Sequence, residues 1–360
     1  MKFPSQLSYG RNPASVLTRL SEPLSLATSN SKVRKGPETE TEAQETRMSR
    51  AFIFPGQGSQ AVGMGKELAE NFPSAREVFQ EVDEALSQKL SKLMWEGPQE
   101  DLTLTENAQP AIMAVSLAVS RTLEKQGGFK LADKAMFVAG HSLGEYSALA
   151  AVGAFSLSDT ARILKLRGQA MQRAVPVGEG AMAVLLGLDF EAAVEVAKEA
   201  AQGDVCTAAN DNGGGQVVVS GAKAAVDRAI EIAKTKGAKR SMLLPVSAPF
   251  HCPLMQPAAD EMEHALAGVT LNTPSVALVA NVTASRVADA DTIRKLLVEQ
   301  VTGMVRWRES VLFMEAQGVT DYIELGAGKA LAGMVKRIAA EPKLASIGTP
   351  ADVETFLTSL

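Results

Sequence analysis

The chain has few residues of the kinds that bind metals, form disulfides or stack on nucleic-acid bases. Its 360 residues include two cysteines, Cys206 and Cys252, and three histidines. Two cysteines cannot form a disulfide framework, which favours a reducing compartment, and the histidines lack metal-ligand spacing. Aromatic residues make up 5% of the chain, too few for a base-stacking surface. These scarcities argue against a metal site, a disulfide-stapled fold and single-strand nucleic-acid binding.

Long apolar runs and an excess of basic charge are also missing. No apolar stretch reaches the roughly 18–20 residues of a membrane span, and the net charge is −5. We therefore expect neither a membrane nor nucleic acid as a partner. The composition, 46% hydrophobic and 21% charged, is typical of a soluble globular protein with one large domain and a smaller one.

Residues 1–47 differ from the rest. The first 37 residues contain seven serines, six Lys or Arg and a single acid. This composition is typical of a disordered segment and of an organelle transit peptide. The alternative is that the segment has no function and translation starts at Met48, directly before the first strand. We expect a cytoplasmic protein, or a mitochondrial one if 1–47 is a transit peptide.

The rest of the chain alternates between strand-like and helical patterns, with one interruption. Over 48–177 and 248–360, apolar strands alternate with helices, which predicts a parallel α/β core. Residues 178–247 follow the order strand, helix, strand, strand, helix, strand, typical of the ferredoxin-like (βαββαβ) arrangement. Strands are expected at 51–54, 135–139, 181–188, 205–209, 216–220, 241–246, 276–280 and 322–325, and helices at 61–71, 74–90, 110–126, 158–175, 190–201, 222–236, 254–267, 291–302, 306–317 and 329–339, before a final strand–helix pair.

The most informative motif is Gly-His-Ser-Leu-Gly at 140–144, between an apolar strand and an Ala-rich helix. This is the context of a nucleophile elbow, in which glycines permit a tight turn. The turn would expose the Ser142 hydroxyl beside the free N–H groups of a helix N-terminus. An oxyanion formed on Ser142 could then be held by the Leu143 N–H. The alternative is a glycine-bounded turn with an ordinary serine.

Two other glycine-rich segments resemble phosphate-binding loops in composition. The run 210–215, Asn-Asp-Asn-Gly-Gly-Gly, is explained better as a hairpin loop between two strands. Residues 324–329, Glu-Leu-Gly-Ala-Gly-Lys, lack the spacing of a phosphate loop, and a turn from strand to helix explains them better.

A serine nucleophile needs a base within hydrogen-bond reach. His141 is expected to point away from its neighbour Ser142, and His264 lies in a polar helical segment. His251 follows a strand and a rigid proline, a position suited to a base, although it could also be a packed loop residue. No acid stands out as its orienter, so a Ser–His dyad held by a backbone carbonyl is as consistent as a triad.

Arg167 is the second unusual residue. It lies on the helix expected to begin with Ser158 as its N-cap. Gly168 beside it costs roughly 1 kcal/mol in mid-helix, so something must pack closely there. A guanidinium near Ser142 would bind a substrate carboxylate bidentately. The alternative is a surface arginine on an amphipathic helix.

Four motifs together resemble the malonyl-CoA:acyl-carrier-protein transacylase family of fatty-acid synthesis. They are Phe-Pro-Gly-Gln-Gly-Ser-Gln at 54–60, the motif at 140–146, the segment around Arg167, and Pro-Phe-His at 249–251. Their order and spacing match over about 50–340. The resemblance implies an α/β-hydrolase-like core with a ferredoxin-like insertion. Gly214, where many relatives have proline, and Cys252, where serine is common, are small departures.

The resemblance also implies roles for individual residues. Ser142 would carry the acyl group, His251 would be the general base, and Arg167 would bind the malonyl carboxylate. The N–H groups of Gln57 and Leu143 would form the oxyanion hole. The backbone carbonyl of Gln300 would orient the histidine.

The implied reaction is ping-pong. Malonyl-CoA acylates the serine, and the phosphopantetheine thiol of holo-acyl carrier protein then takes the malonyl group. No metal or other cofactor is expected, because malonyl-CoA is a substrate and the phosphopantetheine belongs to the carrier. We expect a monomer.

Residues 223–240 contain six Lys or Arg against two acids, either a docking face for the acidic carrier or an ordinary solvated helix. Two rival functions are a serine thioesterase or esterase, in which water resolves the acyl-enzyme, and an idle carrier-binding module.

Overall fold

The structure is a computed structural model that describes residues 49–360. The extension expected over 1–47 lies outside the described residues. Within 49–360, no helix is long and apolar enough to cross a membrane.

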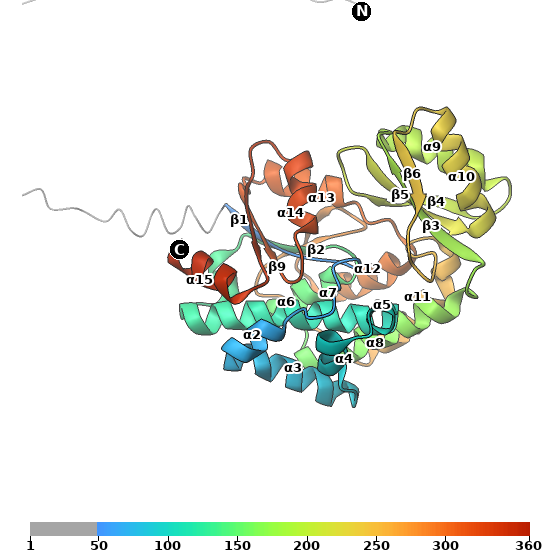
Figure 1. Ribbon diagram of the computed structural model, residues 1–360. Coiled ribbons are helices and arrows are strands. Elements are labelled where there is room, and N and C mark those ends of the chain that lie inside the picture. Colours follow the sequence, from blue (N-terminus) through green and yellow to red (C-terminus); the bar gives the residue numbers. More distant parts are fainter. Residues whose placement is uncertain (1–48) are drawn as a thin grey trace, which may run out of the picture. The chain divides into compact units, whose positions relative to one another are not determined.

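A six-stranded sheet forms the centre of the larger unit (Figure 1). Its order is β10-β9-β1-β2-β7-β8, and all neighbours are parallel except β7 and β8. β1 and β2 are buried along their whole length, as expected of a parallel sheet covered on both faces. The parallel core expected from the sequence is present, and the antiparallel edge strand β8 was not predicted, since three residues are too few to show a period. The strands are β1 (Arg50–Phe54), β2 (Phe137–Gly140), β7 (Leu278–Ala280), β8 (Ser285–Val287), β9 (Asp321–Leu325) and β10 (Lys343–Ile347).

Helices pack on this sheet and on one another. The long helix α6 (Thr105–Gly127) is buried over most of its length and packs against α8 (Leu157–Ala174). A Cβ at Gly168 would lie 2.5 Å from the Glu106 Cα, so glycine lets these two helices touch. This confirms the close packing expected at Gly168. The remaining core helices are α2 (Lys66–Asn71), α3 (Pro73–Leu86), α4 (Leu90–Glu96), α5 (Gln99–Thr103), α7 (Gly144–Ala151), α11 (Gln256–Ala267), α12 (Ala290–Thr302), α13 (Trp307–Ala316), α14 (Ala330–Ile338) and α15 (Pro350–Thr358).

Two helix predictions were wrong in detail. The N-cap of α8 is Ser156, whose side chain accepts from the Asp159 N–H, and Ser158 lies inside the helix. The helix expected over 74–90 ends at Leu86, where Ser87 takes a left-handed conformation, and the separate helix α4 begins at Leu90. Val82, Leu86 and Leu90 keep a helical spacing across the break between α3 and α4, so the sequence pattern does not show it.

A second, antiparallel sheet has the order β4-β5-β3-β6. With its two helices it follows the βαββαβ order expected for the insertion, and its elements fall inside the predicted range 178–247. Ala181, Ala183 and Leu185 pack with the helices, whereas Met182 and Val184 on the other face join the main core. Its elements are β3 (Gly180–Leu186), α9 (Phe190–Ala201), β4 (Cys206–Asp211), β5 (Gln216–Ala222), α10 (Lys223–Thr235) and β6 (Arg240–Leu243).

Both glycine-rich segments are turns. Asn212 donates its N–H to the Gln216 carbonyl at 3.0 Å, closing the β4–β5 hairpin. In the other segment, the Glu324 carboxyl accepts the N–H groups of Leu331 and Ala332 at 3.1 and 2.8 Å, so it satisfies the start of α14. A carboxylate at this helix N-terminus leaves no room for a phosphate, and both turn interpretations are confirmed.

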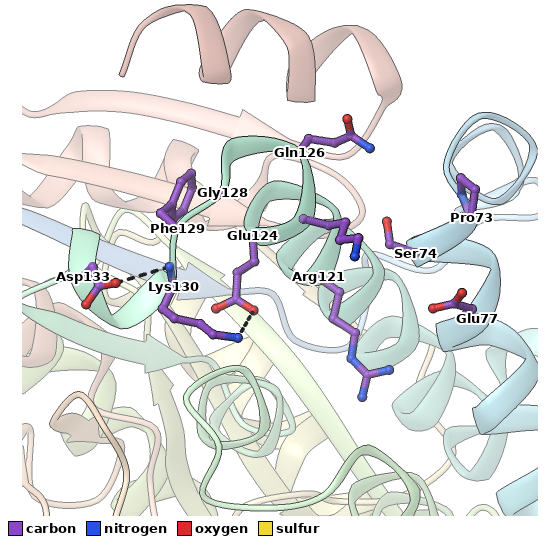
Figure 2. A pocket seen from close by; sticks show the side chains of 11 residues that line it. Pro73, Ser74, Glu77, Arg121, Glu124, Gln126, Gly128, Phe129, Lys130 and Asp133 are labelled. Atoms are coloured by element: carbon purple, nitrogen blue, oxygen red, sulfur yellow. Dashed lines mark hydrogen bonds and ion pairs between the residues drawn. The ribbon is translucent and has the colours of Figure 1, made fainter.

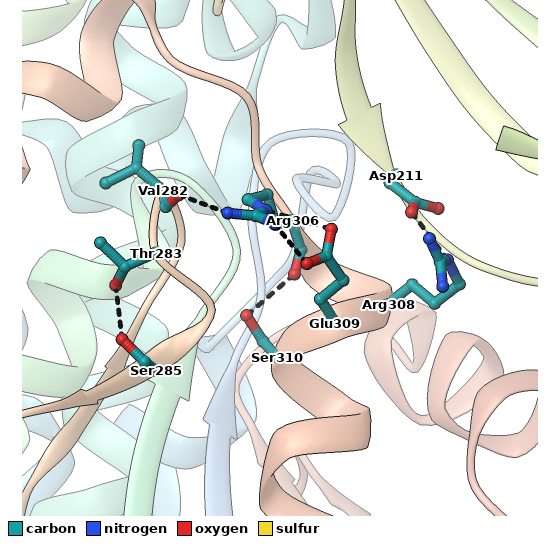
Figure 3. Close-up of polar contacts among 8 residues, drawn as sticks. All are labelled: Asp211, Val282, Thr283, Ser285, Arg306, Arg308, Glu309 and Ser310. Carbon is teal, nitrogen blue, oxygen red and sulfur yellow. Dashed lines mark hydrogen bonds and ion pairs between the residues drawn. The ribbon is translucent and has the colours of Figure 1, made fainter. Parts of the chain in front are cut away.

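The end of β4 is tied to the core (Figure 3). Val305 and the strand exchange backbone bonds, from the Val305 N–H to Ala209 at 2.9 Å and from the Asp211 N–H to Val305 at 3.0 Å. The guanidinium of Arg308 on α13 donates to the buried Asp211 carboxylate at 2.7 Å, and Figure 3 shows the two side chains pointing toward one another. These contacts of β4 with Val305 and Arg308 hold one face of the second sheet over the carboxyl end of β2.

Candidate active site

The motif at 140–144 forms a sharp turn between β2 and α7. Ser142 at its centre has φ 54°, the left-handed region that L-residues rarely adopt. A Cβ at Gly140 would lie 1.9 Å from the Gly144 carbonyl carbon, and one at Gly144 would lie 2.2 Å from the Phe54 oxygen. Only glycine fits these two positions, which confirms the tight turn expected of an elbow.

His251 lies directly against this serine. The Ser142 Oγ and the His251 Nε2 are 2.8 Å apart. The His251 Nδ1 lies 2.9 Å from the Gln300 carbonyl oxygen and 3.1 Å from that of Gly303. Because carbonyl oxygens only accept, Nδ1 carries the proton and Nε2 is free to accept the serine proton. The histidine is therefore oriented by carbonyls, as in a dyad.

Arg167 is buried beside the serine, with 1% of its surface exposed. Its guanidinium donates to the Ser142 Oγ at 3.2 Å, the Gln109 Oε1 at 2.8 Å and the Gln300 Oε1 at 2.9 Å. The alternative of a surface arginine is thus wrong. The helical pattern around Arg167 fitted either face, and only contact with residues far along the chain decides between them.

Burial controls the electrostatics of this site. Desolvation, and then the nearby Arg167 cation, lower the pKa of His251 to about 3. The imidazole is therefore neutral at pH 7, the form that a general base needs. Burial also lowers the pKa of Arg167 and raises that of Glu145 to about 8, because both charged forms lose their hydration.

A cavity of about 430 Å³ opens onto Ser142. Gln57 and Leu143 line it, and within 49–360 no oxygen accepts the backbone N–H of either residue. Leu143 is the N-cap residue of α7, at the helix end where free N–H donors and the helix dipole favour an anion. The other lining residues come from helices α5, α6 and α8, from strands β3 and β4 of the second sheet, and from loops: Gly58, Gln60, Thr103, Gln109, His141, Arg167, Met171, Met182, Asn210, Leu244, Pro245, Val246, Phe250 and His251.

Comparison with known proteins decides the family. Residues 51–347 match the family model of the acyl transferase domain. The malonyl CoA-acyl carrier protein transacylase of Bacillus subtilis is 44% identical over 86% of this chain and 96% of its own length. That of Escherichia coli K12 is 46% identical over 80% and 92%.

The chain belongs to the acyl transferase family.

Solved structures of this family share the fold. The acyl-carrier-protein-S-malonyltransferase of Bartonella henselae is 55% identical, with a TM-score of 0.84 over 86% of this chain and 99% of that one. A malonyl-transacylase in complex with a type II PKS acyl-carrier protein is 42% identical, with a TM-score of 0.84 over 87% and 100%. The fold predicted from the sequence, an α/β-hydrolase-like core with a second small sheet, is thereby confirmed.

The other two histidines of this acyl transferase are not bases for the serine. The His141 Nε2 lies 2.9 Å from the Asn212 Oδ1 in the β4–β5 hairpin, so the ring links the elbow to the second sheet. His264 is exposed on α11, with its Nδ1 2.7 Å from the Asp260 carbonyl oxygen. Both positions agree with the sequence interpretation.

Sequence reasoning missed a buried polar layer behind the elbow. The Asn281 side chain accepts the Ser142 N–H at 2.8 Å and donates to the Gly140 carbonyl at 2.6 Å. The Asn281 N–H donates to the Glu145 carboxyl at 3.1 Å, and the Gln300 amide donates to the same carboxyl. The signal for Asn281 was its place directly after β7, since parallel strands end at one edge of the sheet.

The larger hollow on the core has a different character (Figure 2). Its volume is about 690 Å³, and it lies between the start of α3 and the end of α6. Arg121, Glu124 and Lys130 line it, and Lys130 pairs with Glu124 at 3.9 Å. Most of its polar lining residues are charged, and there is no serine–histidine pair among them.

Proposed function

We propose that this chain transfers the malonyl group from malonyl-CoA to the phosphopantetheine thiol of holo-acyl carrier protein, through a malonyl-serine intermediate. The observation that carries this proposal is the buried Arg167 guanidinium, 3.2 Å from the Ser142 hydroxyl. A buried cation beside the nucleophile suits an acyl group that ends in a carboxylate. The names of the relatives from Bacillus subtilis and Escherichia coli support the same substrate.

The geometry supports a ping-pong sequence. The Ser142 oxygen attacks the thioester carbonyl while the His251 Nε2 takes its proton. The N–H groups of Gln57 and Leu143 hold the resulting oxyanion. The C–S bond then breaks, and the histidine returns the proton to the CoA thiolate. In the second half, the histidine takes the proton of the carrier thiol, whose sulfur attacks the serine ester, and the serine regains a proton as the ester bond breaks.

This chemistry needs no metal or redox group, and the phosphopantetheine arrives with the carrier protein. A carrier partner is supported by the related malonyl-transacylase in complex with its acyl-carrier protein. A monomer and a cytoplasmic location remain part of the proposal, with a mitochondrial location as the alternative.

The basic stretch 223–240 stays the proposed docking face for the carrier. Four of its six basic side chains already pair with acids of this chain, so it offers an acidic partner fewer free charges than its composition indicates. These pairs are Lys223–Asp227, Arg228–Asp204, Lys234–Glu231 and Lys236–Glu199.

The proposal is tested by trapping the intermediate. The protein is incubated with malonyl-CoA labelled in the malonyl group, isolated, and given holo-acyl carrier protein or buffer alone. We expect label on the protein, rapid transfer to the carrier and slow loss in buffer. Rapid loss in buffer would instead indicate the thioesterase alternative, which does not explain the buried cation.

Ser142→Ala is the matched control for the trapping experiment. It removes one oxygen from an otherwise unchanged turn, so we expect folded protein without covalent label. A stable malonyl-enzyme in this variant would place the nucleophile elsewhere.

A further inference from the structure

The Arg167 cation is held by neutral oxygens. Within the described part of the chain its hydrogen bonds go to the carboxamides of Gln109 and Gln300 and to the Ser142 hydroxyl. An amide oxygen orients a guanidinium without cancelling its charge. The cation is therefore already positioned, and no acid is hydrogen-bonded to it within the described residues. Burial lowers its pKa, and the nearby Tyr146 and Glu145 oppose that shift.

A carboxyl group lies just beyond one of these amides. Glu145 on α7 is buried, with 1% of its surface exposed. It lies near enough to Arg167 to raise the pKa of the guanidinium, against the larger lowering by burial. The Gln300 side chain stands between them. Its Oε1 accepts from Arg167 at 2.9 Å, and its Nε2 donates to the Glu145 carboxyl and to the Ser142 carbonyl at 2.9 Å.

The two ends of this amide match the two groups that they face. With the amide between the two groups, burial raises the pKa of Glu145 to about 8, so its carboxyl is largely protonated at pH 7. In direct contact, the Arg167 cation would favour the ionised carboxylate, and the two charges would attract one another in a medium where charges are poorly screened. A direct ion pair would neutralise the cation, and a substrate carboxylate would then have to displace it. The amide satisfies both groups while keeping them apart.

We propose that the Gln300 side chain is a specificity-determining spacer that reserves Arg167 for the carboxylate of the acyl group. This inference rests on the proposed malonyl transfer. It concerns the amide side chain, whereas the orientation of His251 uses the backbone carbonyl of the same residue. Side-chain substitutions leave that carbonyl in place, so the two roles separate experimentally.

The first test is Gln300→Glu, which puts a carboxylate against Arg167 at the same position. The readout is kcat/KM for malonyl-CoA divided by that for acetyl-CoA, which has no carboxylate. We expect this ratio to fall at least about tenfold, because the pair replaces a charge-assisted contact to substrate. A ratio within about threefold of wild type would overturn the proposal.

The second test asks whether the effect is one of charge. Gln300→Ala removes the spacer, and we expect a fall in the malonyl/acetyl ratio. Adding Glu145→Gln leaves no acid to pair with Arg167, so the double variant should recover most of the ratio. If the double variant is as unselective as Gln300→Ala, the amide only supports the elbow and the spacer role is wrong. This pair decides the question even if Gln300→Glu does not fold.

Phenylmethylsulfonyl fluoride, an uncharged serine reagent, reports on the elbow in each variant. We expect its rate of reaction with Ser142 to change much less than the malonyl/acetyl ratio, and an equal loss of both would overturn the proposal. Failure of the proposed function looks different, because wild-type protein itself would then form no malonyl-enzyme.

Discussion

The charged groups at the end of the parallel sheet differ from those on the outer helices of the second sheet. Around the parallel sheet, Glu145, Arg167 and His251 are buried and joined through amides at the end of β2. In the second sheet unit, charges such as Lys198 and Glu195 pair at the surface with more than half of each side chain exposed. Burying a charge costs free energy unless the charge is paired and hydrogen-bonded. An ion pair between solvent-exposed side chains contributes little to stability, because water screens it. The proposed catalytic residues therefore belong to the core, and the second sheet lines the cavity with Met182 and Asn210.

This contrast is tested most severely at His251. His251→Ala removes the proposed base, and we expect both acylation and transfer to fall by about 10²–10⁴-fold, the usual contribution of general-base catalysis. The measurement is single-turnover kinetics of each half-reaction. Rates close to those of wild type would mean that another group takes the serine proton.

Arg167 should show the next largest effect. In its proposed role Arg167 binds the malonyl carboxylate, so Arg167→Ala should cost about 2–5 kcal/mol, which corresponds to roughly 30- to 4,000-fold in malonyl transfer. Acetyl transfer should fall little or rise, so the malonyl/acetyl ratio of kcat/KM collapses. Arg167→Lys should recover only part, because an ammonium lacks the planar fork.

An equal loss for both thioesters in Arg167→Ala would assign the arginine to the fold or to the CoA portion. Selectivity for malonyl would then need another explanation.

The pH profile gives a smaller, signed test. Because the pKa of His251 is lowered to about 3, the base stays neutral and acetyl transfer should be flat from pH 7 to about 5. Removing the Arg167 cation raises this pKa, so the acidic limb of Arg167→Ala should lie at higher pH. A wild-type rate that halves near pH 6.5 would contradict the burial argument.

The same shift affects stability. The folded-state pKa lies below the unfolded value of 6.5, so the unfolded chain binds the proton first and stability falls as the pH falls from 6.5 towards 3. Chemical denaturation of wild type and His251→Gln over this window measures the contribution, since glutamine does not titrate.

The smallest effect is expected in the second sheet. Lys198→Ala removes an exposed ion pair with Glu195 on α9. Solvent screens such a pair, so we expect no measurable change in Tm or in malonyl transfer. A clear loss of either would show that surface charges of this unit matter more than their exposure indicates.

Features set by neighbouring residues could be predicted from the sequence, whereas contacts between residues far apart in the chain could not. The elbow and the second sheet were predicted well because strand, turn and helix signals there are local. The burial of Arg167 could not be, since Gln109 and Gln300 lie 58 and 133 residues away along the chain. Asn281 was missed for the same reason, because its partners in the elbow belong to another strand. Three-residue strands such as β8 show no period to read.

The left-handed backbone at Ser142 has a consequence for which residue this position favours. With φ 54°, a side chain there costs about 1–2 kcal/mol that glycine would not. His251, at φ 58°, carries the same cost, so both partners of the dyad sit where the fold alone would prefer glycine. Selection for stability and selection for activity therefore favour different residues at these two positions. Variants chosen only for thermal stability should drift towards glycine here and lose their chemistry.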